Sequence, residues 1–195
     1  MQALEKITTS NHWITLVLMF LFFCIVLLKT INPSRLKGSL YGFFNINFVE
    51  IESDENTSFF DVFQIVFFVF SVSVISLLVF NFKRYTLRTN DVSFSSFLSV
   101  FLSLLSYFLL LKVLEYLFSQ VFLIKNQVRF FIVSKSNYLN ALSFLLYIAI
   151  VLSEYANLKQ IYLYYFAAFL FFLRFVFHVV SNKNLVFKTL FYFIL

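Results

Sequence analysis

Residues 59–82 read FFDVFQIVFFVFSVSVISLLVFNF, and this stretch decides the fold class of the chain. Its one charged residue is Asp61 near the start, and it ends at the basic pair Lys83 and Arg84. A helix that crosses a bilayer needs about 20 predominantly apolar residues, whereas a transmembrane β-strand needs only about ten. Backbone polar groups in hydrocarbon must also pair within their own segment. The stretch therefore predicts a membrane-spanning helix.

The same criterion applied along the chain predicts an all-α, polytopic transmembrane helical bundle that forms a single domain over residues 1–195. We expect five complete spans, at about 12–28, 59–82, 93–118, 138–158 and 160–180. A sixth run, 185–195, stays apolar to its last residue. As a helix it rises only about 16 Å against a hydrocarbon core of about 30 Å. We interpret it as an incomplete span and expect the natural chain to continue.

Composition excludes most other classes of protein. Hydrophobic residues make up 62% of the 195 and charged residues 12%, whereas soluble domains average about 45–50% and about 25%. The two glycines, one proline and one cysteine, Cys24, argue against disordered, collagen-like and disulfide-rich chains. The net charge of +6 is distributed between the apolar runs rather than gathered on one face. That distribution is typical of membrane anchors and not of a nucleic-acid interface, so we expect no nucleic-acid partner.

The segments between the predicted spans are short, with one exception. We expect residues 29–58, which contain Pro33, to form an interfacial loop whose aromatic middle, 40–48, lies among the lipid headgroups. Residues 128–133 resemble a second short interfacial piece. Two residues are predicted to cap the third and fourth spans: Asp91 and Asn137.

Basic residues on alternate sides of the spans predict the orientation. One side receives Lys6, Lys83, Arg84, Arg88 and Lys159. The other side receives Lys29, Arg35, Lys37, Lys125, Arg129, Lys135, Lys183 and Lys188. The positive-inside rule assigns the richer side to the cytoplasm, which leaves the N-terminus in the periplasm.

Ionisable side chains inside spans are costly and therefore mark candidate functional positions. Five of them fall in the leaflet predicted to be cytoplasmic: Asp61, Lys112, Glu115, Arg174 and His178. They form either a proton or ion relay or a set of interhelical ion pairs, such as Glu115–Arg174 or Asp61–Arg174. Glu154 alone lies near the opposite surface.

Small and polar side chains recur at helical spacing in the second and third spans. The candidate helix-packing seam consists of Gln64, Ser71, Ser96, Ser99, Ser103 and Ser106. Residues of this kind let helices approach and hydrogen-bond in lipid, so we expect the two spans to pack through them. A hydrated pore lined by the serines is the alternative.

No catalytic, cofactor or metal motif is recognisable. His12 and His178 fall at opposite faces of the membrane, so they cannot share a haem iron, and no His, Cys or carboxylate cluster has the spacing of a metal site. Phosphate loops and nucleophile motifs are missing as well. The spans contain neither Gly nor Pro, which argues against the broken helices of many transporters. We therefore expect no enzymatic activity, no cofactor and no bound metal.

The C-terminal stretch 182–195, NKNLVFKTLFYFIL, resembles the closing segment of a Bacteroidota membrane family catalogued as domain of unknown function 4271. The similarity extends through Leu110-Leu111-Lys112 and Tyr138-Leu139-Asn140. The resemblance implies a bacterial inner-membrane protein and supplies no catalytic residue.

Two functional hypotheses follow. The first is a non-enzymatic integral subunit of an inner-membrane protein assembly, possible roles being envelope or secretion functions, with membrane lipids and other integral subunits as partners. The second is a small proton- or ion-coupled permease that uses the five charged residues of the cytoplasmic leaflet.

Overall fold

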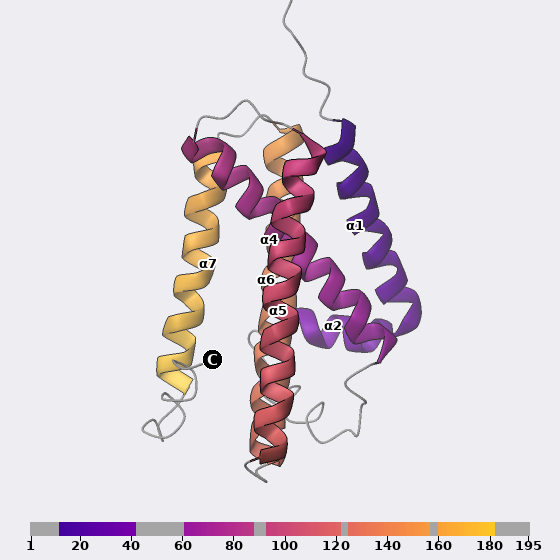
Figure 1. Cartoon of the computed structure of the whole chain (residues 1–195), viewed down its shortest axis with the longest axis vertical. Coiled ribbons are helices and arrows are strands. Elements are labelled where there is room, and N and C mark those ends of the chain that lie inside the picture. Colours follow the sequence, from indigo (N-terminus) through magenta and orange to yellow (C-terminus); the bar gives the residue numbers. More distant parts are fainter. Residues whose placement is uncertain (1–11, 42–60, 88–92, 122–124, 157–159, 182–195) are drawn as a thin grey trace, which may run out of the picture.

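The computed structural model describes residues 12–41, 61–87, 93–121, 125–156 and 160–181. Over these residues the chain is entirely helical, as predicted, and Figure 1 shows the helices running mostly up and down one axis. They are α1 (His12–Ile31), α2 (Pro33–Tyr41), α4 (Val62–Leu87), α5 (Phe94–Val121), α6 (Lys125–Tyr155) and α7 (Gln160–Ser181). The predicted sixth run, 185–195, lies outside the described residues.

Four of these helices are long and apolar enough to cross a membrane. Their qualifying segments are His12–Ile31, Val62–Thr86, Phe94–Leu114 and Lys135–Tyr155. The first four predicted spans are thus confirmed in length and composition. In α7 the side chains are described over the apolar segment Gln160–Leu173, and the role of this helix as a fifth span remains a prediction.

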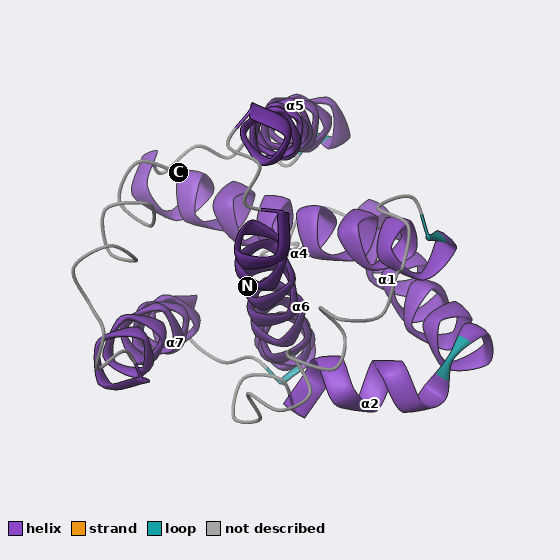
Figure 2. Ribbon diagram, turned by 90° about the horizontal axis from the view of Figure 1, so that it is seen from below, coloured by secondary structure: helices purple, strands orange, loops and turns teal. Residues whose placement is uncertain are grey.

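Helix α4 is the centre of the bundle. Figure 2, viewed along the bundle, shows it crossing the middle with the other helices arranged around it. Five consecutive residues, 70–74, are all buried, so every face of the helix is covered at this level. By contrast, α1 buries a single stripe of residues three or four apart, from Ile14 to Leu28. Such a stripe is the pattern of a helix with one face in the protein and the other in lipid.

Contacts between helix ends show that successive long helices alternate in direction. The ring of Trp13, at the start of α1, lies 5.4 Å from Phe80 near the end of α4 and 5.2 Å from Phe97 near the start of α5. The Tyr155 hydroxyl, at the end of α6, donates to Thr15 Oγ1 at 3.1 Å. We call this end of the bundle the α1 end, and the opposite end, where α2 lies, the α2 end.

Helix α2 corrects the expectation that residues 29–58 form a loop. Asn32 caps it: its side-chain oxygen accepts a hydrogen bond from the Arg35 backbone N–H at 3.0 Å. Pro33 takes the first helical position, where its missing N–H and fixed φ fit the helix. The loop interpretation was wrong for residues 33–41, and most of the aromatic segment 40–48 lies outside the described residues.

Helix α6 corrects two further expectations. Residues 128–133, interpreted as a separate interfacial piece, belong to a continuous helix that begins at Lys125. Asn137, predicted as an N-cap, is instead an interior residue of that helix, and its side chain is buried. The polar residues around Asn137 do not mark a helix boundary. They belong to a face of α6 that packs on α2 and α4. The other predicted cap, Asp91, lies outside the described residues, and Ser93 precedes α5.

Candidate functional site

Asp61, the first residue of the predicted charge cluster, lies immediately before α4 at the α2 end. Its carboxylate forms an ion pair with the guanidinium of Arg35 from α2. The Arg35 side chain is 11% exposed and the Asp61 side chain 33% exposed, so water reaches the acid more easily than the base. The sequence suggests Arg174 as a partner for Asp61 and includes Arg35 only among the basic residues that predict the orientation. The described partner is Arg35.

Two further contacts hold α2 against the bundle. The Arg35 guanidinium lies 4.9 Å from the centroid of the Phe63 ring, in the first turn of α4. The buried Ser39 hydroxyl donates to Asn137 Oδ1 of α6 at 3.2 Å. We name the Arg35–Asp61 pair and the Ser39–Asn137 hydrogen bond the α2 anchor. Because its two contacts reach different helices, the anchor fixes both the position and the direction of α2.

The remaining members of the charge cluster lie on helices that run toward the α2 end. The ammonium of Lys112 on α5 lies 4.4 Å from the centroid of the Phe68 ring of α4, where a cation–π interaction stabilises the charged side chain. The side chains of Glu115, Arg174 and His178 lie outside the described residues. Their pairing stays a prediction.

The helix-packing seam is divided between two surfaces that do not meet. Ser71 is buried, and its hydroxyl donates to Asn140 Oδ1 of α6 at 3.2 Å, while Gln64 is half-buried. On α5 the later serines are exposed, and the hydroxyls of Ser103 and Ser106 donate to the carbonyls of Ser99 and Leu102 in their own helix. The predicted contact of α4 with α5 through these serines was therefore wrong.

Aromatic side chains explain why α5 packs on another face. Phe97 is buried, its ring lies 6.1 Å from that of Phe80 on α4, and Phe101 packs against the same core. A ring reaches farther between two helices than a hydroxyl and offers more van der Waals contact. Each serine hydroxyl can meanwhile bond to the preceding turn of its own helix, so it does not need the interface. Ser96, by contrast, is half-buried and pairs with Ser93 at 2.9 Å.

Sequence reasoning missed a buried polar face on α6. Asn137, Asn140 and Ser143 follow one another at intervals of three residues and point toward α2 and α4. The Ser143 hydroxyl is completely buried and has no hydrogen-bond partner among the described residues. The spacing is visible in the sequence, but Asn137 is predicted there as a cap, and Asn140 and Ser143 are not identified as part of a polar face.

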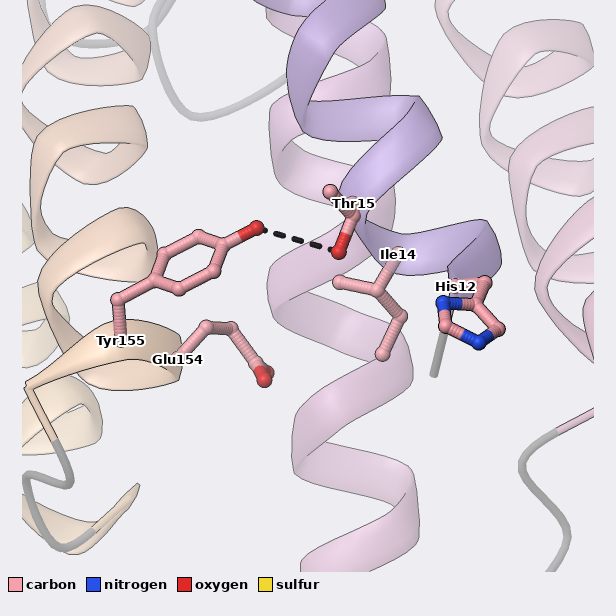
Figure 3. A pocket seen from close by; sticks show the side chains of 5 residues that line it. All are labelled: His12, Ile14, Thr15, Glu154 and Tyr155. Atoms are coloured by element: carbon pink, nitrogen blue, oxygen red, sulfur yellow. Dashed lines mark hydrogen bonds between the residues drawn. The ribbon is translucent and has the colours of Figure 1, made fainter. Parts of the chain in front are cut away.

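A pocket of about 250 Å³ opens at the α1 end, between the start of α1 and the end of α6 (Figure 3). It is lined by His12, Ile14 and Thr15 of α1 and by Glu154 and Tyr155 of α6. Figure 3 shows the Glu154 carboxylate and the Tyr155 hydroxyl both reaching from α6 toward α1. Glu154 is half-buried and forms no hydrogen bond or ion pair with any described residue.

Basic and aromatic side chains of α4 and α7 lie near Glu154 at the same end of the bundle. The Arg84 guanidinium is near enough to act electrostatically on Glu154, without forming an ion pair with a described residue. The Tyr164 ring of α7 lies 5.2 Å from that of Phe82 and 5.5 Å from that of Tyr85. Among the described residues, the α1 end thus brings the Glu154 carboxylate together with basic and hydroxyl-bearing side chains near the point where the spans end.

Within the described ranges, no group of three His, Cys, Asp or Glu side chains is close enough to hold a metal ion. Cys24 is buried in α1 with a free thiol.

Comparison with protein families gives one match, to a domain of unknown function (DUF4271), over residues 14–195. The chain belongs to the DUF4271 family. The DUF4271 match includes the α2 anchor. It also includes every residue that lines the pocket at the α1 end, which we call the terminal pocket, except His12. No curated protein and no solved structure matches this DUF4271 chain.

Proposed function

We propose that this DUF4271 protein is a non-enzymatic integral subunit of a bacterial inner-membrane protein assembly, that it docks through helix–helix contacts, and that the assembly serves envelope or secretion functions. In this proposal α5 is the docking helix. The α2 end faces the cytoplasm, where the larger set of basic residues belongs, and the N-terminus is periplasmic.

The exposure of α5 carries the proposal. Only 6% of its membrane segment is buried inside the bundle, compared with 28% for α1, 39% for α6 and 56% for α4. Its outer face presents Ser99, Ser103 and Ser106, which are small, and the hydroxyls of Ser103 and Ser106 are already hydrogen-bonded to their own helix. Small residues allow the backbone of a second helix to approach closely, and close packing is what drives helix association in lipid.

The lengths of α5 and α6 add a second surface. Helix α5 has 28 residues and α6 has 31, which correspond to about 42 Å and about 46 Å of helix, whereas the hydrocarbon core is about 30 Å thick. Figure 1 shows both helices extending past α2. A helical pair that leaves the membrane at this end gives a partner a contact outside the lipid.

Extraction in a gentle detergent tests this function. The wild-type protein is expected to co-purify with stoichiometric membrane partners. Ser103→Trp places a large ring on the outer face of α5 and is expected to lose those partners, while Leu16→Trp, at a 65% exposed position of α1, retains them. A wild-type protein that purifies alone, or a Ser103→Trp protein that keeps its partners, would contradict the proposal.

The alternative, a proton- or ion-coupled permease built on the charge cluster, is favoured by one observation. Buried hydrogen-bonded polar side chains continue from the Asp61 region into the bundle, through the Ser39–Asn137 and Ser71–Asn140 contacts. In lipid such groups lie along pathways or fasten helices together. Proton or ion flux in proteoliposomes distinguishes the two roles. If these groups form a pathway, the wild-type protein shows pH-dependent flux and Asn140→Leu abolishes it. If they only fasten helices together, the wild-type protein shows no such flux.

A further inference from the structure

The terminal pocket at the α1 end has the features of a binding site that the proposed function does not use. Its volume is about 250 Å³, which is room for a small polar group. One carboxylate, that of Glu154, is half-buried in it and has no partner among the described residues. Partial burial of a carboxylate costs free energy unless a cation or a hydrogen-bond donor pairs with it. The pocket between α1 and α6 has room for such a group.

The other groups around the pocket favour an anion close to that cation. Tyr155 donates its hydroxyl proton to Thr15 Oγ1, which leaves the Thr15 hydroxyl proton available to a further acceptor. His12 lines the pocket with its ring exposed, and Arg84 acts electrostatically on the same region. The start of α1 also carries the positive end of that helix dipole. Groups of α1 that can donate hydrogen bonds to an anion therefore line the same small pocket as the Glu154 carboxylate of α6.

The position of the pocket along the membrane normal indicates where such a ligand comes from. His12 is the first and Tyr155 the last residue of two membrane-spanning segments, so the pocket lies where hydrocarbon gives way to headgroups. A ligand there that carries an ammonium and a phosphate a few bonds apart is a lipid headgroup. We propose that this pocket binds the phosphoethanolamine headgroup of an aminophospholipid, with the ammonium on Glu154 and the phosphate toward His12 and Thr15.

The carboxylate distinguishes phosphoethanolamine from the other common headgroups. A primary ammonium has three N–H donors and can form short, charge-assisted hydrogen bonds to Glu154. Phosphocholine carries the same charge on a trimethylated nitrogen without N–H donors, and phosphoglycerol has no cation. The pocket is therefore expected to select the primary amine.

Lipid binding to the purified full chain tests the assignment. Defined lipids with identical acyl chains are added to the detergent-solubilised protein, and the fraction bound is measured by native mass spectrometry. The wild-type protein is expected to bind phosphatidylethanolamine about tenfold more tightly than phosphatidylcholine or phosphatidylglycerol, the factor that corresponds to one charge-assisted hydrogen bond. Free phosphoethanolamine, which has no acyl chains, is expected to give no measurable occupancy.

Glu154→Gln is expected to bind the three lipids equally. Asp61→Asn makes the same change of charge at the α2 end, away from the pocket, and is expected to retain the preference, which controls for net charge. Equal binding of the three lipids by the wild-type protein would overturn the assignment, as would a preference that survives Glu154→Gln. Occupancy by free phosphoethanolamine equal to that by the lipid would show a soluble ligand instead. These outcomes concern lipid selection and are independent of whether partners co-purify.

Discussion

Removal of the charges of the Arg35–Asp61 pair tests how α2 is held on the bundle. Asp61→Asn and Arg35→Gln each replace an ionic side chain with a neutral one of similar size. The pair lies at the boundary between full burial and exposure, since its side chains are 11% and 33% exposed. The expected effect therefore falls between two limits, about 0.2–1 kcal/mol for an exposed pair and about 3–5 kcal/mol for breaking a buried one.

The exposure of Asp61 sets the value within these limits. A carboxylate that is one-third accessible keeps part of its hydration, and the attraction is screened correspondingly. We expect a coupling free energy of about 1–2 kcal/mol, which is roughly a tenfold change in the unfolding equilibrium constant. Arg35 also contacts Phe63, but that contact is lost in both Arg35→Gln backgrounds and cancels in a double-mutant cycle.

The assay is reversible unfolding in mixed micelles, measured for the wild type, both single variants and the double variant. The double variant is expected to be less destabilised than the sum of the two single variants. A coupling free energy below about 0.3 kcal/mol, within the scatter of independent sites, would refute the role assigned to the pair. The α2 anchor would then rest on the Ser39–Asn137 hydrogen bond alone.

Three smaller perturbations probe the packing of the bundle. Leu146→Ala leaves a cavity at a fully buried position and is expected to lower the free energy of unfolding in micelles by about 1–3 kcal/mol. Leu145→Ala, at a 40% exposed position, is expected to change it by less than about 0.5 kcal/mol. Equal effects of the two substitutions would contradict the described burial. Ser71→Ala removes the hydrogen bond to Asn140 and is expected to cost about 0.6 kcal/mol, measured in the same assay, with no loss refuting that contact. Tyr147→Phe removes a donor to the Leu18 carbonyl and is expected to accelerate hydrogen exchange in that turn of α1 by a few-fold, with an unchanged rate arguing against the bond.

The spans were predictable because their cause is local. A run such as 62–82 is apolar over enough consecutive residues to cross a bilayer, and lipid forces that run into a helix whatever its neighbours are. Helix α2 could also have been found, because Asn32 followed by Pro33 is a helix-start signal. Hydropathy does not reveal it, because a short helix of mixed composition has no continuous apolar run.

Packing partners were not predictable, because they depend on which face of each helix meets which neighbour. Ser71 and Ser103 are both serines at a favourable spacing, yet one bonds to Asn140 of α6 and the other to its own helix. The pairing of Asp61 with Arg35 likewise depends on helix α2, which hydropathy does not predict. Spacing alone identifies a polar face but does not identify its partner.

Single cysteines in a Cys24→Ala background test the membrane-spanning bundle most directly. Ser34→Cys lies at the α2 end, Lys83→Cys near the α1 end and Leu102→Cys in the middle of α5, all at exposed positions. A thiol reagent that cannot cross membranes is expected to label the first two from opposite faces of sealed vesicles and to leave Leu102→Cys unlabelled from either face. Rapid labelling of Leu102→Cys, or labelling of Ser34→Cys and Lys83→Cys from the same face, would contradict a bundle that spans the bilayer between its two ends.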